Sequence, residues 1–96
     1  MKKELKLTYL KKSKKFLDKH NGTLTENEVD ALVVKFIKNK FYNIEQNIDY
    51  KPLQGYMGDF YRIRKGNIRI IVQVLNNEII IEAIIEDIGF RGDIYK

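Results

Sequence analysis

The sequence contains no cysteine, and histidine, serine and proline each occur only once. The absence of cysteine excludes disulfide frameworks, thiolate zinc sites and cysteine nucleophiles. His20 lies beside a predicted helix end, where a capping or surface position explains it better than metal binding. Ser13 falls on a predicted helix and has no partnered base, which argues against a serine hydrolase.

Long apolar runs and phosphate-binding glycine loops are also missing. No apolar segment approaches the length of a membrane span, and the first residues lack the apolar segment of a signal peptide. The cytoplasm is therefore the expected compartment. The glycines fall in turns rather than at a strand-to-helix junction, which excludes a glycine-rich phosphate loop. We accordingly expect neither a metal site nor a cofactor.

The chain does contain enough apolar residues for a core, together with an excess of positive charge. Its 96 residues, 44% of them hydrophobic, suit one domain over residues 1–96 with a modest core. The 18 lysines and arginines outnumber the 13 aspartates and glutamates, which gives a net charge of +5. This balance favours polyanionic partners such as nucleic acid or an acidic protein, although many surface lysines are merely solvated.

Residues 59–86 predict three strands joined by two tight turns. Runs of β-branched residues are interrupted at Gly66-Asn67 and again at Asn76-Asn77. Both pairs suit two-residue hairpin turns, which need a positive φ. The pairing register of the predicted sheet then follows by counting outward from each turn.

The predicted register places arginine directly opposite arginine. In the first hairpin Arg64 lies opposite Arg69, and in the second hairpin Val72 lies opposite Ile81. Because successive side chains of a strand alternate between the faces of a sheet, one face is almost entirely apolar and must be covered. The other face carries Arg62, Arg64 and Arg69 near one end.

This arginine face predicts an anion site. Like charges directly opposite each other destabilise a sheet, so the Arg64–Arg69 pair needs an explanation beyond solubility. A guanidinium group presents a planar fork of donors that grips phosphate bidentately and stays charged. The alternative is a solvated face that keeps the sheet soluble, with Glu82 and Glu86 as partial counter-charges.

Two amphipathic helices are predicted before this sheet, after a short first strand around Leu5 and Leu7. The first helix begins near Tyr9, and residues 25–28 match a capping box that opens the second helix. The expected fold is α+β, in the order β-α-α-β-β-β, with both helices packed on the apolar face of the antiparallel sheet. Residues 43–58 are expected to be irregular and to border the arginine face, which stays open to a partner.

Three short segments carry a resemblance to a known family. They are PLQG at residues 52–55, DFYRIRKGNIRIIVQV at 59–74 and GFRGDIY at 89–95. In this order and spacing they resemble the RelE/ParE superfamily of toxins from bacterial type II toxin–antitoxin systems. The resemblance covers most of the chain, because the short first strand and the two helices also occur in the expected order. It implies a small antiparallel sheet with two N-terminal helices on one face.

The resemblance also implies an activity. RelE-type members cleave mRNA in the ribosomal A site, which implies a metal-independent, ribosome-dependent endoribonuclease that inhibits translation. By position, Arg69 and Arg91 are implied to stabilise the phosphorane, and Tyr95 to orient or stack the substrate base. The residues implied to hold RNA phosphate are Arg62, Arg64 and Lys65.

Departures from the family pattern leave the general base unassigned. The strand positions of Arg62 and Arg64 hold lysines in the best-known RelE-type sites, and Phe90 takes a position where many relatives have histidine. Two other hypotheses remain, a ParE-type inhibitor of DNA gyrase and a non-catalytic RNA- or partner-binding relic. A toxin of this kind implies a cognate antitoxin, expected to carry an acidic segment that folds as it wraps the basic face and the helices.

Overall fold

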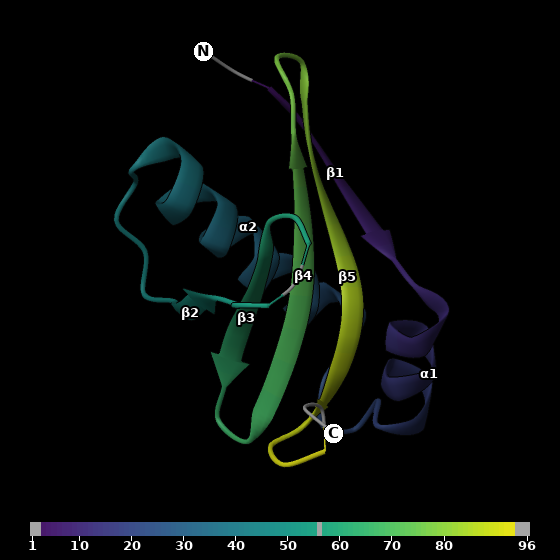
Figure 1. The fold of residues 1–96 in the computed structure, drawn as a ribbon. Coiled ribbons are helices and arrows are strands. Elements are labelled where there is room, and N and C mark those ends of the chain that lie inside the picture. The colour runs from purple at the N-terminus through teal and green to yellow at the C-terminus, as the bar shows by residue number, and fades with distance from the viewer. Residues whose placement is uncertain (1–2, 56, 94–96) are drawn as a thin grey trace.

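The computed structural model of the chain describes residues 3–55 and 57–93, and its sheet has five strands in the order β1-β5-β4-β3-β2. The elements are β1 (Glu4–Tyr9), α1 (Lys11–Lys19), α2 (Glu26–Tyr42), β2 (Asp49–Pro52), β3 (Phe60–Lys65), β4 (Ile68–Asn76) and β5 (Ile80–Phe90). β1 runs parallel to β5, and the other neighbouring strands are antiparallel (Figure 1). The predicted α+β fold is confirmed, with β2 as an additional strand inside the segment that was expected to be irregular.

The second helix forms where its capping box predicts. The Thr25 side chain accepts a hydrogen bond from the backbone N–H of Glu28, and the Glu28 carboxylate accepts one from the Thr25 N–H. The helix ends at Asn43, which has a left-handed conformation with φ 55°. Within the described ranges, neither helix combines the length and the apolar character that crossing a membrane would need.

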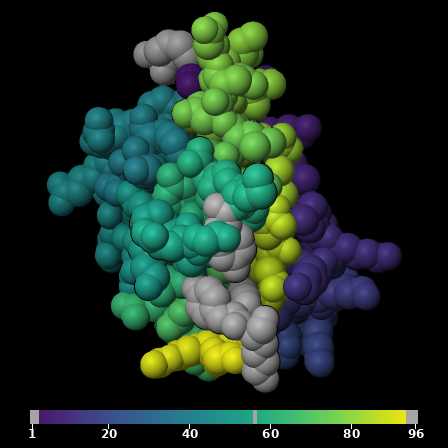
Figure 2. Space-filling view, in the orientation of Figure 1, coloured from purple at the N-terminus to yellow at the C-terminus, as the bar shows by residue number. Residues whose placement is uncertain are grey.

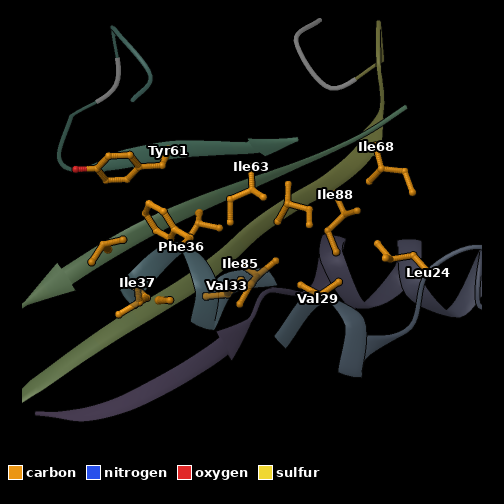
Figure 3. Close-up of a cluster of buried hydrophobic side chains, with 14 of the residues drawn as sticks. Leu24, Val29, Val33, Phe36, Ile37, Tyr61, Ile63, Ile68, Ile85 and Ile88 are labelled. Carbon is orange, nitrogen blue, oxygen red and sulfur yellow. The ribbon is translucent and has the colours of Figure 1, made fainter. Parts of the chain in front are cut away.

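The core lies between α2 and the apolar face of the sheet (Figure 3). Phe36 is fully buried, and its ring lies 4.9 Å from the ring of Tyr50 and 5.0 Å from that of Tyr61. The predicted apolar face is confirmed along β3, β4 and β5. Its fully buried members are Ile63, Ile70, Val72, Ala83 and Ile85.

The first helix packs against the C-terminal half of β5, beyond the end of β1 (Figure 1). The backbone N–H of Leu10 and the buried Ser13 hydroxyl both donate to the carbonyl oxygen of Ile85. Ile85 is also the last β5 residue that pairs with β1. The neighbour of β5 therefore changes at this residue from a strand to a helix, and Leu17 of that helix joins the core.

The register of the first hairpin is confirmed, with Arg64 opposite Arg69, but that of the second hairpin is wrong. β4 continues to Asn76, which pairs with Ile81. Residues 77–79 form the loop to β5, and the Asn77 side chain accepts hydrogen bonds from the backbone N–H groups of Ile79 and Ile80. Val72 therefore lies opposite Ile85 instead of Ile81, a slip of four residues. Because the slip is even, the side chains of β5 keep their predicted faces up to Ile85.

Candidate anion-binding site

The three predicted arginines of the sheet differ strongly in their exposure. The side chain of Arg64 is 50% exposed and that of Arg62 13%, whereas Arg69 as a whole residue is 6% exposed. The expectation of three arginines on an open face is therefore wrong for Arg69 and largely wrong for Arg62. Arg64 is the member of this trio that solvent and a large ligand can reach.

Arg69 is directed at the backbone of its own hairpin. Its Nη1 atom donates to the carbonyl oxygen of Gly66 at 2.8 Å and to that of Ile68 at 3.2 Å. Gly66 has a φ of 56°, which belongs to the tight turn predicted there. A buried guanidinium group is tolerated only when it is hydrogen-bonded, so these carbonyl contacts offset part of the cost of burying the charge of Arg69. Arg69 thus braces the turn between β3 and β4.

Asp49 is a residue of this site that the sequence analysis missed. It lies on β2 directly opposite Arg64. One carboxylate oxygen lies 2.5 Å from Arg64 Nη2, and the other lies 3.8 Å from Arg62 Nη2. A single carboxylate therefore balances two guanidinium groups, which reduces the repulsion expected from the Arg64–Arg69 pairing.

In the alternative of a solvated face, Glu82 and Glu86 were the expected partial counter-charges. The structure places Glu82 near β1, where it accepts a hydrogen bond from the Thr8 hydroxyl at 2.7 Å. Asp49 was missed because its segment was expected to be irregular. The alternation of polar Asp49, apolar Tyr50 and polar Lys51 was the available signal for a strand, although it is only a few residues long.

Arg62 lies beneath this ion pair. Its Nε atom is buried and has no hydrogen-bond partner in the described part of the chain. Buried donors are nearly always paired, so such an atom is unusual. The Arg62 side chain therefore adds positive charge below Asp49 without reaching far into solvent.

A second group of exposed cations gathers at the turn between β3 and β4. Lys65 ends β3 at this turn, and Arg91 follows the last residue of β5. The backbone N–H of Arg91 donates to the carbonyl oxygen of Asn67 at 2.8 Å, which holds Arg91 beside the turn. In Figure 1 the turn and the end of β5 lie at the same end of the sheet. Tyr95 lies outside the described residues.

The described residues of β3 and of the turn supply positive charge more clearly than proton transfer. Tyr61 belongs to the core, and burial raises the pKa of its hydroxyl, with Asp59 as a smaller cause. A tyrosine with a raised pKa stays protonated near neutral pH and is a poor base. His20 caps the C-terminus of α1, as expected, through its backbone N–H to Phe16. Among the described residues, no three His, Cys, Asp or Glu side chains are placed to hold a metal ion.

Comparisons with known proteins give matches in structure but none in sequence. Neither a protein-family model nor a curated protein matches the sequence. The solved structure of a metal-bound toxin from Helicobacter pylori matches with a TM-score of 0.65 and 18% identity, over 95% of this chain and 99% of that one. YafQ from Escherichia coli matches with a TM-score of 0.64 and 13% identity, over 97% and 100% of the chains.

RelE structures solved in complex with RelB show the same arrangement. The complex from Methanococcus jannaschii matches with a TM-score of 0.54 and 22% identity, over 92% of this chain and 94% of that chain. These matches cover nearly the whole of each chain, and they show that the fold of this chain, a mostly antiparallel sheet with two N-terminal helices, is one found in solved toxin structures. More specifically, the fold is that of the solved YafQ and RelE structures, as the sequence resemblance implied.

Proposed function

We propose that the protein is the toxin of a type II toxin–antitoxin pair and cleaves mRNA on the ribosome without a metal. The observation that carries this proposal is the gathering of exposed Arg64, Lys65 and Arg91 at one end of a RelE-like sheet. Arginine is suited to bind phosphate, since its planar fork of donors stays charged and reaches two oxygens at once. The solved RelE and YafQ structures share the fold of this chain, and the positive charge at this end of the sheet supports phosphate binding as its function.

The different exposure of the arginines suggests that they have different roles in cleavage. Arg64 and Arg91 are accessible and are assigned to the charge that develops on the phosphorane, with Lys65 as a further phosphate contact. Arg69 is assigned to holding the turn from which Lys65 and Arg91 reach the substrate, in place of the direct contact that the resemblance implied. Tyr95 keeps its proposed contact with the substrate base.

Cleavage on purified ribosomes that carry a defined mRNA tests this proposal. Arg91→Ala should lower the cleavage rate by about 10²–10³, the effect of removing one preorganised donor from a transition state. The matched control is Lys35→Ala, which removes one exposed positive charge from α2. Equal cleavage by the wild type and the Arg91 variant would contradict the proposed chemistry, as would intact mRNA after induction of the wild type in a bacterial host.

A gyrase assay tests the alternative in which the protein resembles ParE-type toxins. The fold is compatible with either activity, so the target has to be measured directly. Purified wild-type protein is added to DNA gyrase, and supercoiling of relaxed plasmid is followed. We expect no inhibition at concentrations that cleave mRNA. Inhibition of supercoiling without mRNA cleavage would replace the proposed function with the ParE-type activity.

A cognate antitoxin follows from the same proposal. The archaeal RelE proteins with this fold were solved in complex with RelB. We expect the partner of this chain to carry an acidic segment that folds on the basic surface. Co-expression with the product of the adjacent reading frame should restore growth and give a complex that copurifies. A tight complex with a neutral or basic neighbour that lacks such a segment would count against this partner.

A further inference from the structure

A cavity of about 540 Å³ lies between α1 and the last residues of β5, and no part of the proposed cleavage chemistry uses it. It forms where β1 ends and α1 takes over as the neighbour of β5. The volume lies within the range of pockets that bind small ligands. Its lining residues from α1 and its C-cap are Lys12, Lys15, Phe16, Lys19 and His20, and those from β5 and the following turn are Asp87, Ile88, Gly89, Phe90 and Asp93.

One wall of the cavity is cationic. Lys12, Lys15 and Lys19 are spaced so that they share one face of α1, because residues three and four apart are neighbours on a helix. Lys12 lies 3.3 Å from Asp87, so these two charges largely balance each other. Lys15 and Lys19 are exposed and form no ion pair with the described residues. Because Asp93 also lines the cavity, these two lysines leave it with a small excess of positive charge for an anionic ligand.

The other wall is aromatic. The ring of His20 lies 4.5 Å from that of Phe16 and 5.0 Å from that of Phe90, and the two phenylalanine rings lie 5.3 Å apart. All three residues are half-buried, so part of this ring cluster borders the cavity. Aromatic side chains beside lysines are the combination with which proteins bind single-stranded nucleic acid, by stacking bases and pairing phosphates.

The cavity borders the end of β5, the strand that leads into the proposed cleavage site. Phe90, which contributes a ring to the cavity, directly precedes Arg91. Gly89 lines the cavity and pairs with Arg69 in the sheet. In Figure 2 the yellow β5 runs beside the purple and blue-purple N-terminal elements, β1 and α1. A polymer whose phosphate is held at Arg91 therefore has this cavity beside it.

We propose that this cavity binds a nucleotide of single-stranded RNA, with the base against the Phe16, His20 and Phe90 rings and a phosphate on Lys15 and Lys19. The choice of RNA over an acidic peptide rests on the proposed function, because Phe90 of the cavity directly precedes Arg91 and the two residues can therefore contact the same polymer. An acidic peptide would pair with the lysines but would gain little from the ring cluster. The binding step itself needs no cleavage, so it can be tested separately.

Binding of a short single-stranded RNA with 2′-O-methyl sugars, which resists cleavage, tests this assignment. Lys15→Ala/Lys19→Ala should weaken binding several-fold and reduce the slope of log affinity against log salt by roughly 1. The matched control is Lys35→Ala/Lys38→Ala, which removes the same charge from exposed positions of α2. If the control weakens binding as much, the lysines act only through net charge and the site is disproved.

Occupancy of the aromatic wall has a direct spectroscopic readout. His20 is the only histidine in the sequence, so its ring signals can be assigned without ambiguity in an NMR spectrum of the wild-type protein. They should shift on addition of the RNA, and shift much less with the same oligonucleotide made abasic. Unchanged ring signals at saturating RNA would overturn the proposal. An acidic peptide of equal charge that shifts them as strongly would replace RNA with a protein partner.

Failure of this site and failure of the proposed function give different results. Wild-type cleavage of mRNA combined with RNA binding that is unaffected by Lys15→Ala/Lys19→Ala removes the cavity proposal alone. RNA binding that depends on both lysines, in a protein that leaves mRNA intact, supports the cavity and removes the cleavage proposal alone.

Discussion

The two faces of the sheet are held by different kinds of interaction. On the face covered by α2, aliphatic and aromatic side chains are buried against one another, and the identity of each partner matters less than its volume. On the other face, Arg69 depends on particular carbonyl oxygens and Arg64 on a particular carboxylate. The first face is therefore specified by a pattern along the chain, and the second by individual partners from other elements.

Substitution of Phe36, on the face covered by α2, is expected to have the largest effect on stability. Phe36→Ala should lower the free energy of unfolding by about 3–5 kcal/mol, because it removes a fully buried ring that packs against Tyr50 and Tyr61. Urea denaturation followed by circular dichroism measures the change. Phe41→Ala is the control, since this ring is only half-buried and should cost clearly less. Equal losses for both variants would show that burial does not rank the residues of this face.

Arg69 and Arg64 provide a matched pair on the other face. Arg69→Ala should destabilise the protein by about 1–3 kcal/mol, since it leaves turn carbonyls without a donor. Arg64→Ala should change stability by about 1 kcal/mol or less, as expected for an exposed ion pair. Thermal or urea unfolding of both variants tests the difference. If Arg64 proved the more stabilising of the two, the proposed bracing of the turn by Arg69 would be incorrect.

Tyr9 makes a polar contact between β1 and α2, and this contact should make the stability of the protein depend on pH in the alkaline range. Its hydroxyl donates to Asp30 of α2, and burial together with this carboxylate raises the pKa of Tyr9 well above its ordinary value near 10. A raised folded-state pKa stabilises the protein fully below pH 10, and that contribution is lost as the pH rises further. Tyr9→Phe should cost about 1 kcal/mol at neutral pH and flatten the loss of stability above pH 10.

Stability measured between pH 7 and 11 distinguishes this effect from general alkaline unfolding. Tyr42→Phe serves as the comparison, because Tyr42 is exposed at the end of α2. Parallel stability curves for the wild type and Tyr9→Phe at high pH would remove the proposed contribution of the Tyr9 hydroxyl.

Asp49 has the smallest expected effect on stability and an effect of opposite sign on binding. Asp49→Asn should change the free energy of unfolding by about 1 kcal/mol or less, because the ion pair with Arg64 is partly exposed. The same change should tighten RNA binding several-fold, since Arg62 and Arg64 lose the carboxylate that competes with phosphate. Asp18→Asn, on the exposed side of α1, controls for net charge. Weaker RNA binding by Asp49→Asn would instead make the carboxylate a positioning group for the arginines.

The difference between the faces also explains how far the sequence could be interpreted. Periodic apolar residues predicted α2 and the covered face, and the Gly66-Asn67 turn predicted the register of the first hairpin, because each of these depends on neighbours in the chain. The predicted register of the second hairpin was wrong because the Asn77 side chain organises a longer loop than the pattern suggested. The even slip left the predicted faces intact, so the core was correct despite the wrong pairing.

The candidate site was less predictable because its details depend on distant partners. The positions of Arg62, Arg64 and Arg69 on one face followed from alternation, but their exposure did not. Asp49 comes from a strand too short to recognise from its sequence, and it determines the surroundings of Arg64. The cavity beside β5 could not be predicted from the sequence either, since it depends on where β1 ends and α1 begins.

The parallel pairing of β1 with β5 has a consequence for synthesis of the chain. β1 contains residues 4–9, yet its partners in the sheet are residues 80–85. Because translation proceeds from the N-terminus, β1 has no strand to pair with until residues 80–85 have been made. A chain that terminates before Ile80 lacks the strand on which both β1 and α1 pack. The native sheet, and with it the arrangement of Arg64, Lys65 and Arg91, therefore becomes available only after β5 has been made.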